Sequence, residues 1–413
     1  MLMRECIVKF ANLSRIDSTQ SLTLSANSGM RLNFAIFLAS FSLLVSSCQP
    51  AKKLSTSQKD AGISSLRFIG ERDIPYALTY NNTTVGGLSG IDYNSAEDHY
   101  YLICDDRSAI NPARYYSMKI RISPNGIDTL YFTAEHPLLQ PGGTTYPNSR
   151  QNPANTPDPE SMRYNSRKKQ LVWTSEGERI VREKDTVLSD PAIRIIDTAG
   201  NFIDSLVVPQ NMRMQGIEKG PRQNGVFEGM SFSDDFKTMF VSVEEPLFED
   251  GPRADTFDNN AYIRILKFDT ETKRNTGQYA YKLDPVAYPA NPPSGFKING
   301  VPDILSLGNN RLMVIERSFS TGRLACTIKI FIADLSAASD ITNNPSIRDR
   351  KNFSSATKTL LLNMDELGIY TDNIEGVTFG PLLPNGHRTL LFVADNNFSP
   401  IEKSQVLLFE VIE

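Results

Sequence analysis

The feature that most constrains this chain is a phrase that it repeats five times. The clearest copy, FEGMSFSDDFKTMFVSVEE, covers residues 227–245, and the others cover residues 88–106, 159–177, 302–317 and 374–396. Each copy reads as a short strand, a turn rich in Asn, Asp, Ser or Gly, and a nearly apolar second strand. Such repetition is typical of one supersecondary unit that packs against copies of itself.

The spacing of the copies supports a true repeat. Their opening positions lie 68 to 75 residues apart, and length differences within a copy fall in the turn, where a hairpin tolerates them best. Two more segments with strand-like alternation follow most copies. Four antiparallel strands per unit, repeated radially, predict an all-β fold, a β-propeller. The opening positions are Ser89, Glu160, Glu228, Asp303 and Glu375.

The last copy is followed by only one further strand, residues 405–413. We expect its missing partner to come from residues 65–75, so that N- and C-terminal strands close the ring and leave no open edge there. This arrangement predicts five blades in a domain of residues 66–413. Six blades are the alternative, because the inserts 136–159 and 285–301 are long enough to hide strands.

The front of the chain predicts export. Residues 30–48 carry Arg31 near their start and continue with an apolar stretch too short to span a bilayer, which is typical of a signal peptide. The run from Val45 to Cys48 resembles a bacterial lipobox, in which the cysteine carries lipid; an ordinary signal with an incidental cysteine is the alternative. Residues 1–29 do not fit before a signal and are predicted to be a mis-annotated extension. Residues 49–65 read as a flexible tether.

These segments predict a lipid-anchored protein of the bacterial cell envelope that meets the membrane only through its anchor. The net charge of −4 and the pI of about 5.6 give no basic footprint for nucleic acid. Cys104 and Cys326 are expected to be buried thiols rather than a disulfide. The three histidines are isolated and show no zinc-type spacing, so a metal here would be a hard cation bound by oxygen.

The repeated carboxylates indicate where such a cation could bind. If the opening positions line the propeller channel, Glu160, Glu228, Asp303 and Glu375 meet at one end, with Ser89 in the fifth place. Four carboxylates in a small space require a cation or strongly raised pKa values. Ca²⁺ bound by these residues and Glu244 would relieve the repulsion. In the alternative, the carboxylates are structural and accept backbone N–H groups from neighbouring blades.

A second set of acids ends the second strand of each hairpin and should lie near the same rim. Arginines are interspersed with it, and a hard cation with arginines suits a phosphate ester. Salt bridging at the rim is the alternative for each arginine. The acids are Asp105, Asp106, Glu176, Glu244, Glu245, Glu316 and Asp395, and the arginines are Arg107, Arg163, Arg179 and Arg317. No histidine accompanies a plausible nucleophile, which disfavours a Ser-His-Asp mechanism.

The phrases GLSGIDY, DPESMRY, FEGMSF and NIEGVTFGP, with the strand ends VSVEE and VADNN, resemble the family called "esterase-like activity of phytase" over residues 66–413. The resemblance implies a secreted or lipid-anchored bacterial propeller that hydrolyses phosphate or other esters with Ca²⁺. It also implies that Glu160, Glu228, Asp303 and Glu375 hold metal and that Arg163 or Arg317 holds phosphate. Ile304 departs from the pattern, since other copies have Gly or Ser after the carboxylate.

Together these patterns predict a Ca²⁺-dependent hydrolase of a small, phosphorylated ester. Its catalytic residues would be Glu228, Glu375, Arg163 and Arg317. The rival hypothesis is a non-catalytic propeller module that binds a sugar, a peptide or a partner protein.

Overall fold

The computed structural model describes residues 62–348 and 352–413. The predicted extension, the signal peptide with Cys48 and most of the tether lie outside these residues. Ile63 is already buried against the core, and the first strand begins at Ser65. No helix within 62–348 or 352–413 is long and apolar enough to cross a membrane.

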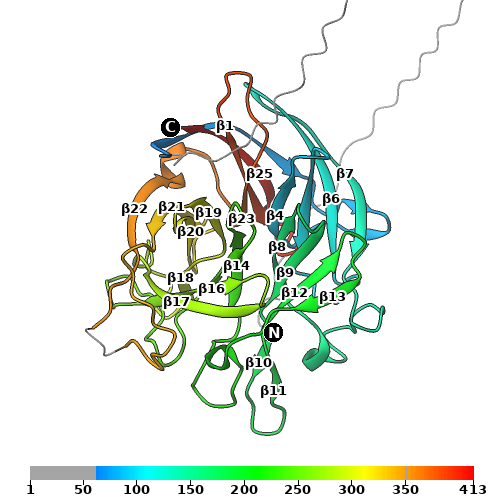
Figure 1. Cartoon of the computed structure of the whole chain (residues 1–413). Coiled ribbons are helices and arrows are strands. Elements are labelled where there is room, and N and C mark those ends of the chain that lie inside the picture. The colour runs from blue at the N-terminus through cyan, green and yellow to red at the C-terminus, as the bar shows by residue number, and fades with distance from the viewer. Residues whose placement is uncertain (1–61, 349–351) are drawn as a thin grey trace, which may run out of the picture. The chain divides into compact units, whose positions relative to one another are not determined.

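Five antiparallel sheets form the domain, and they are arranged as blades around a centre (Figure 1). Blade 1 comprises β4 (Leu88–Asn94), β5 (His99–Cys104), β6 (Arg114–Ser123) and β7 (Gly126–Pro137). Blade 2 comprises β8 (Pro159–Asn165), β9 (Gln170–Ser175), β12 (Ala192–Asp197) and β13 (Phe202–Ser205). Blade 3 comprises β14 (Phe227–Phe232), β15 (Thr238–Val243), β16 (Tyr262–Asp269) and β17 (Arg274–Lys282).

Blade 4 holds one more strand than the others. It comprises β18 (Lys297–Gly300), β19 (Ile304–Gly308), β20 (Arg311–Ser320), β21 (Thr327–Asp334) and β22 (Thr357–Asn363). Both β18 and β19 pair with the long strand β20, so the insert before the fourth hairpin extends this blade instead of founding another. The five-bladed prediction is therefore confirmed, and the six-bladed alternative is not.

The fifth blade closes the ring as predicted. It comprises β23 (Asn373–Phe379), β24 (Thr389–Asp395), β25 (Ser404–Ile412) and β1 (Ser65–Ile74). β1 pairs antiparallel with β25 from Ser65 opposite Ile412 to Ile74 opposite Ser404. Figure 1 shows blue β1 beside red β25.

Smaller elements decorate the connections. They are the hairpins β2 (Thr79–Tyr80) with β3 (Thr83–Thr84) and β10 (Glu178–Ile180) with β11 (Val187–Ser189), and the 3₁₀ turns η1 (Pro153–Asn155), η2 (Gln210–Met212) and η3 (Met364–Leu367).

The inner strand of each blade is the first strand of its repeated phrase. β4, β8, β14, β19 and β23 contact one another in this order around the ring, and β23 contacts β4 again. The apolar second strands pack against neighbouring sheets; one core cluster, for example, joins Met313 of β20 to Phe392 of β24. Cys104 and Cys326 are buried free thiols, as predicted.

A β-bulge marks the opening residue in four of the five hairpins. The register shifts at Ser89, Glu160, Glu228 and Glu375. In the fourth hairpin an equivalent one-residue step falls between β18 and β19: Gly300 lies opposite Arg317 and Ile304 opposite Val314, and Asp303 lies within that step. A bulge re-aims its extra residue, and the glycine after it allows close approach: a Cβ on Gly229 would meet Asp303 Cα at 2.6 Å.

Candidate functional site

Carboxyl groups from four blades gather at one end of the channel. They come from the starts of the inner strands and the ends of the antiparallel second strands, which meet at the same rim. Mutual repulsion links their pKa values. We call this group the acid cluster: Asp105, Asp158, Glu160, Glu176, Glu228, Glu244, Glu375 and Asp395.

Three members of the acid cluster form a candidate metal centre on blade 2. One carboxylate oxygen from each of Asp158, Glu160 and Glu176 lies within 4.8 Å of the others, and all three side chains are buried. Asp158 and Glu160 flank Pro159 at the start of β8, while Glu176 directly follows β9. The hairpin therefore brings residues 16 and 18 positions apart to one point.

The acid cluster resists ionisation. Burial and repulsion from Glu228 and Asp158 hold the pKa of Glu160 well above its usual range. Burial and repulsion from Asp158 do the same to the pKa of Glu176. Burial raises the pKa of Asp158 to about 7, although the Arg107 guanidinium opposes this shift. Without a cation, part of the acid cluster is therefore protonated near neutral pH.

Two arginines offset some of this charge. Arg317, from β20, donates to Asn373 Oδ1 at 2.6 Å and to Glu244 Oε1 at 2.8 Å, and it also bonds Glu375. Arg107 pairs with Glu178 at 2.6 Å and lies 3.5 Å from Asp158. Eight carboxyl groups thus face two guanidinium groups, one of which is shared with Glu178.

Some cluster oxygens are buried without a hydrogen bond of ordinary geometry among the described residues. These are Oδ1 of Asp105 and both carboxylate oxygens of Asp395, whose residue is only 1% exposed. The Asn397 N–H lies near enough to lower the pKa of Asp395 somewhat, but burial and Glu375 still hold that pKa well above its usual range. Buried polar atoms normally have partners, so these oxygens indicate a missing one.

Arg163 and Asp303 do not join the acid cluster and instead bind each other inside the channel. Arg163 Nη2 donates to both Asp303 oxygens at 2.8 and 2.7 Å, and Nη1 donates to the Ile91 carbonyl at 2.7 Å. The Val377 N–H donates to Asp303 Oδ2 at 2.8 Å. This pair, which we call the channel lock, ties four blades together. The phosphate-binding role of Arg163 and the metal-binding role of Asp303 stay predictions.

Asp303 has a separate place because Arg163 and the Val377 N–H bind its carboxylate. The bulged positions Glu160, Glu228 and Glu375 turn toward the acid cluster, whereas Asp303 faces Arg163. Burial raises the pKa of Asp303 to about 6 despite the opposing guanidinium. Ile304, which stands where other copies have Gly or Ser, was the sequence signal for this difference.

The remaining rim residues have structural partners. Ser89 Oγ donates to the Glu160 carbonyl at 2.8 Å and so joins blades 1 and 2. Asp106 pairs with Arg114, and Glu245 with Arg253. Glu316 accepts from Tyr281 Oη at 2.7 Å, and Arg179 donates to the Gln215 carbonyl at 3.0 Å.

The residues predicted to bind metal and phosphate therefore fall into two separate groups. Glu160, Glu228, Glu244 and Glu375 lie in the acid cluster, as does the arginine Arg317, while Asp303 and Arg163 form the lock. Sequence reasoning missed Asp158 and did not include Glu176 among the ligands. Asp158 and Glu160 flank Pro159 in the sequence, and this pair of acids at the start of the second hairpin could have pointed to Asp158.

The arrangement suits a hard cation. The group of Asp158, Glu160 and Glu176 consists of carboxylates alone, which are oxygen donors of the kind that Ca²⁺ prefers. Ca²⁺–oxygen distances of about 2.4 Å allow ligand oxygens to lie up to about 4.8 Å apart across one ion, and one oxygen from each of Asp158, Glu160 and Glu176 lies within that limit of the others.

Comparison with known proteins gives the family but no close relative. No curated protein sequence matches this chain. Among solved structures, an endo-arabinase from Bacteroides thetaiotaomicron shares 11% identity over 82% of this chain and 98% of that chain, with a TM-score of 0.41. A gluconolactonase from Xanthomonas campestris shares 9% identity over 85% of this chain and 96% of that chain, with a TM-score of 0.34. These scores are too low to carry an argument about activity.

The family model described as "Phytase-like: Esterase-like activity of phytase" matches residues 83–398. The match covers all five inner strands, the acid cluster and the channel lock. The chain belongs to this phytase-like family.

Proposed function

We propose that this protein is a Ca²⁺-dependent hydrolase of small phosphate esters that acts at the acid cluster. The observation that carries the proposal is the surplus of buried carboxylates around Asp158, Glu160 and Glu176. Folding alone gains nothing from such a surplus, because each unpaired buried charge costs free energy. A bound divalent cation offsets that cost.

Charge balance supports a cation at these three residues. Asp158, Glu160 and Glu176 carry three negative charges when ionised, and Arg107 offsets only part of one because Glu178 competes for it. One divalent cation would neutralise most of the remainder and bring the raised pKa values down. When bound, the cation would also stabilise charge on a phosphoryl group and activate water.

The chain's own residues would handle binding and proton transfer. Glu228 hydrogen-bonds Glu176, and burial and the Glu176 charge hold the pKa of Glu228 well above its usual range. It can therefore keep a proton near neutral pH and donate it to the leaving oxygen of the ester. Arg317, whose side chain is 12% exposed, holds a fixed positive charge beside Glu375 for the phosphoryl oxygens.

A non-catalytic binding module is the second candidate. Its support is that Glu244, Glu375 and Arg317 already satisfy one another, as a structural staple would. In that case the cation would only stabilise the ring and the propeller face would bind a partner.

The test compares thermal unfolding and turnover in the same samples. The full chain is stripped with a chelator and titrated with Ca²⁺ while melting and hydrolysis of a panel of phosphomonoesters are followed. A ligand that binds only the native state stabilises it by about 2.7 kcal/mol at a hundred times its Kd, so we expect a rise of several degrees. Turnover should appear over the same Ca²⁺ range.

Glu160→Gln should lose both the Ca²⁺-induced rise and the turnover. Glu410→Gln is the matched control, because Glu410 is also buried but pairs with Arg67 and His387 in the closing sheet. A Ca²⁺-induced rise without turnover of any ester would favour the binding module. No rise at millimolar Ca²⁺ would reject the cation itself.

We also propose that Cys48 carries lipid and anchors the protein in the bacterial envelope. The lipobox-like run before it supports this proposal. Cys48→Ala should release the protein from the membrane fraction and abolish metabolic labelling with a fatty acid. Labelling that persists in the variant would contradict it.

A further inference from the structure

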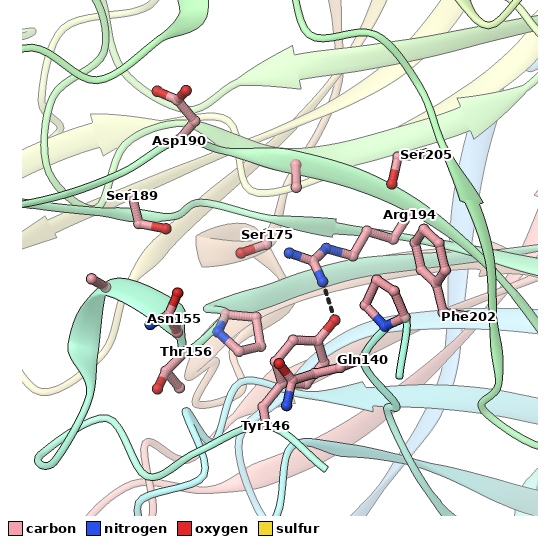
Figure 2. Close-up of a pocket in the computed structure, with 14 residues that line it drawn as sticks. Gln140, Tyr146, Asn155, Thr156, Ser175, Ser189, Asp190, Arg194, Phe202 and Ser205 are labelled. Carbon is pink, nitrogen blue, oxygen red and sulfur yellow. Dashed lines mark hydrogen bonds between the residues drawn. The ribbon is translucent and has the colours of Figure 1, made fainter. Parts of the chain in front are cut away.

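A second site lies outside the channel, in a pocket on blade 2. The pocket has a volume of about 320 Å³, which is within the range of small-molecule sites. It lies between the segment 140–157, which follows β7, and strands β12 and β13 (Figure 2). Its lining includes Gln140, Tyr146, Ser175, Ser189, Arg194 and Phe202.

Arg194 is held rigidly in this pocket but has no carboxylate partner among the described residues. Its guanidinium lies 5.1 Å from the ring centre of Tyr146 and 5.5 Å from that of Trp173, and Nη1 donates to Tyr146 Oη. The more deeply buried arginines, such as Arg114 and Arg264, each pair with a carboxylate. Arg194 thus presents to the pocket a guanidinium group whose positive charge is not neutralised by a carboxylate among the described residues.

Asp190 also lines the pocket, but its carboxylate already has hydrogen-bond partners. Asp190 accepts from Arg213 Nη1 at 2.6 Å and from the Met214 N–H at 2.8 Å. Figure 2 shows its carboxylate pointing away from Arg194, whose guanidinium points across the pocket toward Ser175. No carboxylate therefore offsets the charge of Arg194 inside the pocket.

Ser175 adds a second donor. Its Oγ accepts the N–H groups of Asp158 at 3.0 Å and Gly177 at 3.3 Å, so its hydroxyl hydrogen remains available to an acceptor in the pocket. Donors on both sides of a cavity, with the ring of Phe202 as an apolar wall, suit a negatively charged organic molecule.

We propose that this pocket binds a small organic anion, whose carboxylate or phosphate group is gripped by Arg194 and Ser175. The planar guanidinium matches the two oxygens of such a group. The proposal goes beyond the hydrolase and does not depend on it, because binding requires neither the cation nor turnover.

Trp173 provides the measurement, since it is the chain's single tryptophan and contacts Arg194 directly. The full chain, kept in chelator, is titrated at constant ionic strength with glucose 6-phosphate and with glucuronate. Trp173 fluorescence and heat of binding are recorded together. We expect a saturable change in both at submillimolar to millimolar ligand, the usual range for a single ion-paired contact.

Arg194→Gln should weaken binding at least tenfold, and Arg194→Lys should restore only part of it because lysine lacks the fork. Arg167→Gln is the matched control: Arg167 also stacks on a ring, that of Phe236, but lies away from the pocket. Binding of the phosphate but not the carboxylate compound would assign a phosphate group, and the reverse a carboxylate. No heat with either compound, or equal binding by Arg194→Gln, overturns the proposal.

Discussion

The acid cluster and the channel lock both involve the inner strands of the blades, yet buried charge is balanced in the lock and left in surplus in the cluster. In the lock, Arg163 faces Asp303, and backbone groups of neighbouring blades complete the hydrogen bonds of both. In the acid cluster, eight carboxyl groups face two arginines, and neither oxygen of Asp395 has a hydrogen bond of ordinary geometry among the described residues. The lock is what a propeller needs to hold its blades together. The nearby surplus of carboxylates in the acid cluster is not needed for folding and therefore indicates a ligand.

The largest effect should come from breaking the lock. Arg163→Met leaves Asp303, which is 0% exposed, as an unpaired buried carboxylate. Removing one partner of a buried pair costs about 3–5 kcal/mol. Chemical denaturation in excess Ca²⁺ measures the loss.

The double variant Arg163→Met with Asp303→Leu is the control, and it should recover most of the stability. If the single variant lost less than about 1 kcal/mol, the lock would not be the structural element described here.

The contribution of the acid cluster to stability should fall as the pH rises, whereas the contribution of an ordinary salt-bridged carboxylate rises. The pKa of Asp158 is raised to about 7 by burial, so the folded state binds more protons than the unfolded state. In chelator, its contribution is intact below about pH 4 and is lost as the pH rises to about 7. Asp158→Asn removes this dependence.

We therefore expect the two proteins to be equally stable near pH 4 and the variant to be the more stable at pH 8. The rise of the Asp158 pKa from 3.8 to about 7 corresponds to a difference of about 4 kcal/mol. Unfolding free energies across this pH range measure it, and a constant difference would show that Asp158 is ionised in the folded state throughout.

A smaller effect should follow from Asp395→Asn. This change removes one buried negative charge from the acid cluster and relieves the repulsion with Glu375. Adjacent charged groups couple by roughly 0.5–3 kcal/mol, so we expect a gain of about 1 kcal/mol in chelator at pH 8. Excess Ca²⁺ should shrink this gain, and a loss of stability in chelator would contradict the surplus-charge interpretation.

The smallest effect on stability should come from Ser89, the uncharged residue among the five opening positions. Ser89→Ala removes the hydrogen bond to the Glu160 carbonyl and should cost about 1 kcal/mol. The Ca²⁺-induced rise in melting temperature should not change. If it did, the backbone of Glu160 would have to be set by Ser89 as well as by the β8 bulge.

The five-bladed ring was predictable because the hairpin that builds each blade is repeated in the sequence. Five copies of one hairpin, each with an apolar second strand, leave few arrangements other than a radial one, and the pairing of residues 65–75 with the last strand of the fifth blade was expected from the four-strand pattern. By contrast, β18 lies in an irregular insert, and its short sequence KING carries no strand pattern. Its pairing depends on the unusual length of β20.

The candidate site was predictable only in part. Glu160, Glu228 and Glu375 share a motif, and their gathering follows from the ring. The partnership of Arg163 with Asp303 joins residues 140 positions apart, and no repeated pattern in the sequence records it. The pocket at Arg194 depends on how the segment 140–157 folds back on blade 2, and no periodicity records that path.

The closing sheet also sets the timing of folding. Ser64 Oγ donates to the Ile412 carbonyl across 348 residues of sequence. At a synthesis rate of about 5–20 residues per second, β1 leaves the ribosome roughly 20 to 70 s before β25 exists. Throughout that interval β1 is an unpaired edge that can pair with a wrong strand. The fifth blade therefore cannot assemble during synthesis of the first four, and the ring closes only after the chain has been made as far as β25.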